Sequence, residues 1–244
     1  STGEIEVVAS KIEVLGKCKN VLPFEINTDQ EVREDLRLEY RFLDLRNEKN
    51  LLMFKVQTCL INAMREFVVK NDFIEIHTPK IISTASESGS QVFEVKYFDR
   101  KAYLAQSPQF YKQMAMCSGF ERVFEIAPAF RAENSNTKTH ASEFWMIEPE
   151  IAFCDLNMDM DIMEDMLKYV VKYVLDNCPN EMSFFDNFVE KGLLDKLHKL
   201  INSKFTRIDH EEVISILKKA PIKWEFAPEY GEDIAREQIG RAHV

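Results

Sequence analysis

The feature that most constrains the fold is a pair of strand-like segments that bracket a polar loop. Residues 122–129 and 143–153 are rich in β-forming side chains, whereas residues 134–142 between them are polar. This loop is too long for a tight hairpin turn. Loops of this kind, held between regular elements, often carry binding or catalytic residues. We therefore expect functional side chains at this loop and at the strand ends beside it.

Several other segments have helical patterns. Apolar residues recur at helical spacing over residues 51–69, which predicts one long amphipathic helix. Ser107 and Pro108 are typical of a helix start and Gly119 of a helix end, so a helix is expected from there to about residue 118. Shorter helices are predicted around 193–201 and 211–218. Another helix face, expected in the core, carries Met163, Met166, Leu167, Val170, Val171 and Val174.

The remaining regular patterns are those of strands. Residues 1–22 alternate between apolar and polar side chains, as in the last strands of a small β domain, and residues 28–37 form a polar, acidic connector. Residues 73–81 alternate like a strand that carries Pro79, which favours an edge or an interface. Residues 92–105 suggest a hairpin. Antiparallel strands with at least three helices, and no regular βαβ alternation, predict an α+β fold.

Composition narrows the functional classes. With 244 residues and 45% apolar side chains, the chain is long and apolar enough to form a core, which excludes a disordered protein. The formal net charge is -10, so binding to a polyanion would need a local basic patch. The five cysteines show no CxxC spacing, which favours a reduced, cytoplasmic compartment. No segment has the roughly 18 apolar residues that a membrane span requires.

The strongest candidate site follows the first strand of the pair. Arg131 and Glu133 alternate with apolar residues and therefore point to the same side, and Lys138, His140 and Phe144 follow. A guanidinium binds phosphate through paired hydrogen bonds, a carboxylate accepts from an exocyclic amine, and an aromatic ring stacks on a base. Together these groups would suit a nucleotide. The alternative that Arg131 and Glu133 form a surface ion pair on a hairpin stays open from this pattern alone.

These residues carry a resemblance to a known family. The segment FRAENSNTKTHASEFW at 130–145 resembles motif 2 of the class II aminoacyl-tRNA synthetases, and FIEIHTPKI at 73–81 resembles their motif 1, including its interface proline. LEYRFLDLR at 38–46, QSPQFYKQ at 106–113 and the segment 130–153 are similar to the aspartyl/asparaginyl branch. The resemblance covers essentially residues 1–238.

The resemblance implies a domain plan. An antiparallel catalytic sheet edged by helices would follow the tail of an OB-type anticodon-binding β-barrel, with residues 1–25 as that tail and 26–37 as a hinge. Residues 38–238 would be a partial catalytic domain that holds motifs 1 and 2 but lacks motif 3. Residues 239–244 match the translation of a common sequencing adapter, so we expect them to be non-native. Such a fragment would be inactive alone.

The resemblance also implies a reaction and its residues. The family uses ATP and Mg²⁺ to convert an amino acid to an aminoacyl-adenylate, transfers it to tRNA, and forms homodimers through motif 1, here Pro79. No metal ligand is expected within this chain. Carried over by position, the ATP-binding residues would be Arg131, which would also be catalytic through the α-phosphate, Glu133 on the adenine amine, Phe144 on the adenine ring, and His140. The amino-acid-binding residues would be Glu87, Ser107, Gln109, Lys112 and Glu148.

The motifs give conflicting predictions of which amino acid is the substrate. A lysine at the position of Lys112 pairs with the substrate carboxylate in the aspartyl enzymes, and a buried ammonium facing a neutral amide would lack a charge partner. The larger share of the matched length resembles asparaginyl enzymes. We therefore expect asparagine and tRNA(Asn). The alternatives are an aspartate–tRNA ligase acting on tRNA(Asp), one that charges both tRNAs with aspartate, and a tRNA-free amino-acid ligase of the same fold.

Overall fold

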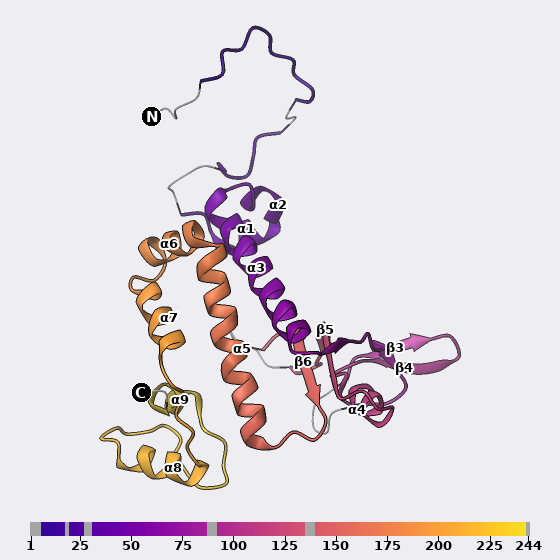
Figure 1. Ribbon diagram of the computed structural model, residues 1–244. Helices are drawn as coiled ribbons and strands as arrows, with labels where there is room; N and C mark the ends of the chain where they lie inside the picture. Colours follow the sequence, from indigo (N-terminus) through magenta and orange to yellow (C-terminus); the bar gives the residue numbers. More distant parts are fainter. Residues whose placement is uncertain (1–5, 18–19, 27–30, 87–91, 135–139, 243–244) are drawn as a thin grey trace.

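The computed structural model describes residues 6–17, 20–26, 31–86, 92–134 and 140–242 (Figure 1). The elements in chain order are α1 (Glu34–Glu39), α2 (Arg41–Asp44), α3 (Glu48–Lys70), β1 (Ile74–Glu75), β2 (Ile81–Ile82), β3 (Glu94–Tyr97), β4 (Arg100–Leu104), α4 (Gln109–Cys117), β5 (Arg122–Phe130), β6 (Glu143–Ile151), α5 (Leu156–Asn177), α6 (Pro179–Phe188), α7 (Leu193–Asn202), α8 (His210–Lys219) and α9 (Arg236–Ala242). None of these described helices meets the length and apolarity that a membrane crossing requires.

The predicted strand pair is present. β5 and β6 are antiparallel over nine residues each, in a register that runs from Arg122 opposite Ile151 to Phe130 opposite Glu143. β1 joins the free edge of β5 in the parallel direction. The expected hairpin is also confirmed, since β3 and β4 pair around a turn at Phe98 and Asp99. Small sheets and helices without βαβ alternation agree with the predicted α+β class.

Residues 73–81 do not form one strand as expected. β1 covers only two residues, the chain then leaves the first sheet, and β2 pairs with β4 in a second sheet of order β2-β4-β3. The intervening Thr78 and Lys80 bond to the side chain of Glu125 on β5 instead of entering a ladder. Pro79 between them has no N–H to donate, which suits a segment that passes from one sheet to the other.

The two faces of the β5–β6 ribbon differ in character. One face is apolar: Phe124 is fully buried against Phe67, Val68 and Phe73, and the helices α3 and α5 cover it. Side chains of directly opposed residues in an antiparallel pair share a face, and each strand alternates between faces. The opposite face carries three buried or partly buried carboxylates, those of Glu125, its partner in the register Glu148, and Glu150.

The two long helices lie side by side in Figure 1. α3 confirms the helix predicted over 51–69 but begins at Glu48, because the Asn47 side chain accepts a hydrogen bond from the Lys49 N–H. The expected core face of α5 is only partly right. Val170 and Val174 are buried, whereas Met163 and Leu167 are about half exposed. Met163 follows Ile162 and Leu167 follows Met166, and these two preceding side chains pack against the core. One residue corresponds to a rotation of about 100° around the helix, which turns Met163 and Leu167 away from the contact.

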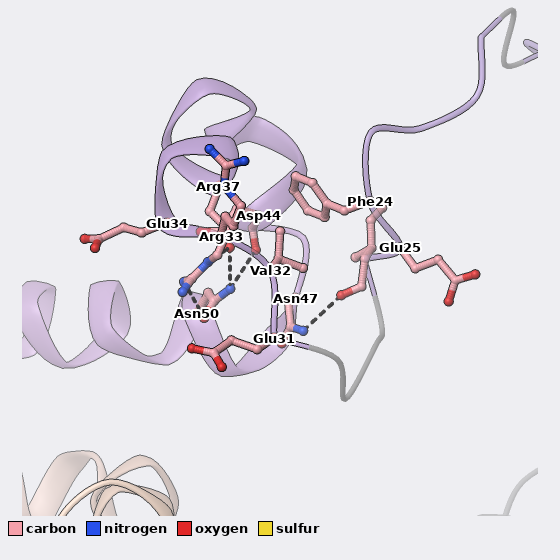
Figure 2. A pocket seen from close by; sticks show the side chains of 11 residues that line it. Phe24, Glu25, Glu31, Val32, Arg33, Glu34, Arg37, Asp44, Asn47 and Asn50 are labelled. Atoms are coloured by element: carbon pink, nitrogen blue, oxygen red, sulfur yellow. Dashed lines mark hydrogen bonds and ion pairs between the residues drawn. The ribbon is translucent and has the colours of Figure 1, made fainter.

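Four described helices were not predicted, namely α1, α2, α6 and α9. α1 and α2 stand within and after the region expected to be a connector, and Figure 2 shows how they are held to α3. The carboxylate of Asp44, 3% exposed, accepts from Arg37 Nε at 2.7 Å, from Asn50 Nδ2 at 2.8 Å, and from Arg41. Asn47 Nδ2 donates to the carbonyl of Ile26 at 3.0 Å, which fixes the incoming chain.

The expectation of strands over residues 1–22 is wrong for the part of that segment the structure describes. Residues 6–17 and 20–26 contain no strand, and the apolar side chains of Val7, Leu15 and Val21 are about nine-tenths exposed. An alternating segment becomes a strand only where a neighbouring strand accepts its hydrogen bonds, and none of the described strands lies beside it. The structure therefore does not show the β-barrel tail that the resemblance implied.

The last third of the chain is helical. α7 and α8 confirm the two helices predicted there, and α8 has its own small core of Val213, Ile214 and Leu217, closed by Trp224 and Ile234. α9 includes residues 239–242 of the tail that was expected to be non-native, and residues 243–244 lie outside the described residues.

Candidate nucleotide and amino-acid site

One cavity gathers the residues predicted to bind ATP. It measures about 350 Å³ and is lined by Arg131, Glu133, His140, Ala141 and Phe144. The end of β5 and the start of β6 position these residues, because the Arg131 N–H donates to the carbonyl of Ser142 at 3.0 Å and extends the ribbon past its last ladder pair. Lys138 of the same loop lies outside the described residues.

The guanidinium of Arg131 and the ring of Phe144 face each other in this cavity. Their separation is 5.3 Å from Arg131 Cζ to the ring centroid. Two stacking contacts of about 3.5 Å each would need roughly 7 Å, so a purine does not fit between them in this arrangement. A base can stack on the face of Phe144 that Arg131 covers only after the guanidinium moves aside. Arg131 Nε is buried and has no hydrogen-bond partner among the residues that the structure describes.

The residues predicted to bind the amino acid form a second, buried cluster. The side chain of Lys112, 4% exposed, lies between two carboxylates, with Nζ 3.0 Å from Glu148 Oε2 and 3.2 Å from Glu150 Oε2. Gln109 Nε2 donates to the same Glu150 oxygen at 3.1 Å. The hydroxyl of Ser107 accepts from the Gln109 N–H at 3.1 Å, which fixes the start of α4.

The local sequence explains why α4 presents these side chains to the ribbon. The helix starts at Gln109, one residue later than predicted, with Pro108 at the cap position, and Gly119 at a φ of 95° follows its end as predicted. The segment before it is anchored on both sides. The Phe130 N–H donates to the Ala105 carbonyl at 3.0 Å, and Gln106, fully buried, accepts from the Ser86 N–H at 3.1 Å.

Lys112 does not have the isolated charge that the sequence argument assumed. That argument favoured aspartate because an unpaired ammonium would need a substrate carboxylate. The chain itself supplies two carboxylates, Glu148 and Glu150, so the three side chains together carry one negative charge. Glu148 Oε1 is buried without a hydrogen-bond partner among the described residues. The cluster therefore lacks a hydrogen-bond donor rather than an anion.

Both groups of residues lie on one face of the ribbon. Phe144, Glu148 and Glu150 are separated by even numbers of residues along β6, so their side chains point to the same side. Phe144 and Glu148 are four residues apart, about 13 Å along a strand. The nucleotide cavity and the buried cluster are thus neighbours on the face that α3 and α5 leave uncovered.

Some site residues were not predicted. Glu150 could have been found, since it stands two residues after Glu148 on a predicted strand. Glu125 and Lys80 could not, because their pairing depends on the strand register and on the path of the segment between the two sheets. Of the predicted residues, Glu87 lies outside the described residues, and Pro79 is exposed on the segment between the two sheets, where its role at a subunit interface stays a prediction.

A magnesium site does not emerge from the described residues. Among them, no three His, Cys, Asp or Glu side chains are grouped as metal ligands. The carboxylates of the buried cluster are engaged by Lys112 and Gln109. The described residues therefore do not by themselves form a set of ligands for the ion.

The antiparallel β5–β6 ribbon covered by helices on one face agrees with the sheet that the synthetase resemblance implied. The chain matches the family described as tRNA synthetases class II (D, K and N) over residues 33–240. It belongs to this family.

Individual relatives divide between the two amino acids. The chain is 40% identical over 235 residues to an aspartate–tRNA(Asp) ligase of Pyrococcus abyssi, covering 95% of this chain and 50% of the relative. It is 40% identical over 254 residues to an asparagine–tRNA ligase of Acholeplasma laidlawii, with 95% and 54% covered. The chain thus spans about half the length of the curated relatives it matches.

A solved structure shows the same fold. The asparaginyl-tRNA synthetase of Pyrococcus horikoshii, complexed with asparaginyl-adenylate, matches with a TM-score of 0.73 and 34% identity, covering 85% of this chain and 45% of that one. The resemblance to the aspartyl/asparaginyl branch is confirmed. The comparisons do not separate asparagine from aspartate.

Proposed function

We propose that the chain is part of an ATP-dependent asparagine–tRNA ligase that forms an aminoacyl-adenylate. The observation that carries the proposal is the placement of the nucleotide cavity and the Lys112 cluster on one face of the β5–β6 ribbon. An amino acid held at the cluster could direct its α-carboxylate toward the α-phosphate of ATP in the cavity. One carboxylate oxygen would form a bond to phosphorus while the bond from phosphorus to the pyrophosphate oxygen breaks.

The nucleotide side of this reaction needs binding and charge stabilisation. Arg131, with its unpartnered Nε, would donate to the α-phosphate oxygens, where negative charge develops during the attack. Glu133 would accept from the adenine amine and Phe144 would stack on the ring after the guanidinium moves to the phosphate. His140 would line the same cavity toward the phosphates. No covalent bond to the protein is required.

The amino-acid side favours asparagine. Glu148 Oε1 needs a hydrogen-bond donor, and the side-chain amide of asparagine supplies one, whereas an aspartate carboxylate does not. The side-chain carboxylate of aspartate would also be the third carboxylate in a cluster that already carries one net negative charge. The family resemblance assigns Ser107, Gln109 and Glu148 to the ammonium and backbone of the substrate, and Glu87 to the loop that closes over it. We propose the contact between Glu148 Oε1 and the side-chain amide in addition.

Aspartate is the second candidate, including an enzyme that charges both tRNAs with it. In this case Lys112 would bind the side-chain carboxylate of aspartate, because its ammonium is the only cation in the described part of the buried cluster. The substrate carboxylate could replace Glu150 beside it. Glu150 would retain its hydrogen bond from Gln109. Relatives named aspartate–tRNA(Asp/Asn) ligase, such as that of Methanopyrus kandleri at 39% identity, support this alternative.

The remaining partners follow from the family. We propose a cytoplasmic homodimer that contacts its second subunit through the segment around Pro79, uses Mg²⁺ with ATP, and transfers the amino acid to tRNA(Asn), or to tRNA(Asp) under the alternative. Residues 38–238 would form the partial catalytic domain, 26–37 the hinge, and 1–25 would belong to an anticodon-binding barrel. Residues 239–244 would be a non-native tail that does not belong to the enzyme. The fixed carbonyl of Ile26 supports an anchored hinge.

Amino-acid-dependent ATP–pyrophosphate exchange tests the proposal. A full-length protein that contains this chain is offered asparagine and aspartate separately. Exchange with asparagine alone supports the proposal, and exchange with aspartate alone replaces it by the alternative. If neither amino acid supports exchange while the protein is folded, the ligase assignment itself is wrong.

A further inference from the structure

We propose that the ion pair between Lys80 and Glu125 is a positioning element of the amino-acid pocket. The inference rests on the proposed function and deepens it, because it assigns a role to two residues outside the predicted site. Glu125 is 2% exposed, lies in the middle of β5, and has its carboxylate engaged entirely by the segment that carries Pro79. Lys80 is not part of the Lys112 cluster.

Three hydrogen bonds fix the Glu125 carboxylate. The Thr78 N–H donates to Oε1 at 2.8 Å, the Thr78 hydroxyl donates to Oε2 at 2.8 Å, and Lys80 Nζ lies 2.9 Å from Oε2. Lys80 Nζ also donates to the Thr78 hydroxyl at 2.8 Å. A buried carboxylate with this many donors is held in one position, and so is the segment that supplies them.

The strand register brings this carboxylate to the pocket. Glu125 on β5 is directly opposite Glu148 on β6, so both side chains leave the ribbon on the same face. Directly opposed residues have Cβ atoms about 5 Å apart. Two like charges at this spacing destabilise a sheet unless each has its own cation. Glu125 forms an ion pair with Lys80, and Glu148 forms one with Lys112.

The arrangement predicts what loss of Lys80 does. An uncompensated Glu125 would repel Glu148 or compete with it for the Lys112 ammonium, since these charges are buried in one region. Either movement displaces the two side chains proposed to contact the substrate side chain. The Arg131 and Phe144 cavity lies about 13 Å further along the ribbon and holds no part of the pair. Amino-acid binding should therefore weaken while ATP binding does not.

The experiment compares Lys80→Met with wild type in a full-length protein that contains this chain. In ATP–pyrophosphate exchange, the KM for the amino acid should rise about tenfold and the KM for ATP should stay near the wild-type value. Lys80→Arg, which keeps the charge, should restore most of the affinity. The matched control is Lys101→Met, which removes the exposed pair with Glu94 on the β3–β4 hairpin and should change neither KM.

A double variant separates charge balance from simple structural support. Lys80→Met with Glu125→Gln removes both charges, so it should bind the amino acid better than Lys80→Met alone and also remain measurable if that single variant does not fold. Amino-acid binding in the double variant that is as poor as in Lys80→Met, or worse, overturns the inference. An unchanged amino-acid KM in folded Lys80→Met does the same. Absence of exchange in wild type instead contradicts the proposed function.

Discussion

The guanidinium carbon of Arg131 lies 5.3 Å from the centroid of the Phe144 ring, and both side chains line one cavity. The pair occupies the place where an adenine ring and a phosphate are proposed to bind. Under the proposed function, Arg131 would exchange its contact with the Phe144 ring for a phosphate oxygen during the reaction. The effect of replacing Arg131 on the rate of adenylate formation can therefore be measured separately from any effect on the stability of the fold.

Replacement of Arg131 by alanine should slow adenylate formation strongly. The loss of one positioned donor at a developing oxyanion typically lowers the rate by about 10²–10³-fold. Single-turnover formation of the aminoacyl-adenylate in a full-length protein measures this directly. Arg100→Ala is the matched control, since Arg100 is exposed on β4. Arg131→Ala with wild-type turnover would contradict the role assigned to this guanidinium.

A second prediction concerns the oxygen of Glu148 that has no partner among the described residues. In Glu148→Gln, one of the two acceptor oxygens becomes an NH₂ donor and the charge is lost, so the side chain matches a substrate amide less well and repels a carboxylate less. We expect kcat/KM in exchange to fall about tenfold for asparagine, and by less for aspartate. Glu143→Gln on the same strand, where the residue is exposed, is the control. An equal loss for both amino acids would argue against a direct contact.

The parts of this fold that were predictable are those set by local patterns. The β5–β6 strands, the helix starting near Ser107 and the long helix α3 each follow from residues close in sequence. The candidate residues around Arg131 line one cavity because they stand on two consecutive strands and the loop between them. Their binding roles stay predictions, as does that of Glu148.

The parts that failed depend on partners distant in sequence. Alternation over residues 1–22 indicated strands, but a strand exists only beside another one. The ion pairs of Lys112 are formed with two carboxylates from β6, and the spacing of residues within its own helix does not reveal them. The Lys80–Glu125 pair needs both a register and a crossing between sheets. Asp44 was overlooked because its burial follows from how α1 and α2 pack on α3.

Removal of the Asp44 carboxylate should destabilise the junction between α1, α2 and α3. In Asp44→Ala, Arg37, Arg41 and Asn50 lose their common acceptor. Both arginines are about a third exposed and can turn to water, so we expect a loss of about 2 kcal/mol of unfolding free energy, below the usual cost of an uncompensated buried charge. Urea unfolding followed by circular dichroism measures it.

The control for this variant is Asp35→Ala, which removes the exposed ion pair between Arg33 and Asp35 a few residues away. Exposed pairs contribute little, so its unfolding curve should overlie that of wild type. Equal midpoints for Asp44→Ala and Asp35→Ala would show that the buried network does not stabilise the junction.

A last prediction concerns stability at alkaline pH. Cys59 on α3 and Cys178 after α5 lie together in the apolar cluster that joins these helices. Burial, with a smaller contribution from the hydrogen bond to Cys178, raises the pKa of the Cys59 thiol from 9.0 to about 11. The unfolded chain therefore releases this proton first, so the neutral thiol stabilises the fold below pH 9 and the stability is lost as the pH rises from 9 to 11. By pH 10 the unfolding free energy should fall by about 1 kcal/mol.

Cys59→Ala should flatten this part of the pH profile, whereas alanine at Cys117, which is exposed, should leave it unchanged. A wild-type slope that persists in Cys59→Ala would place the titrating group elsewhere.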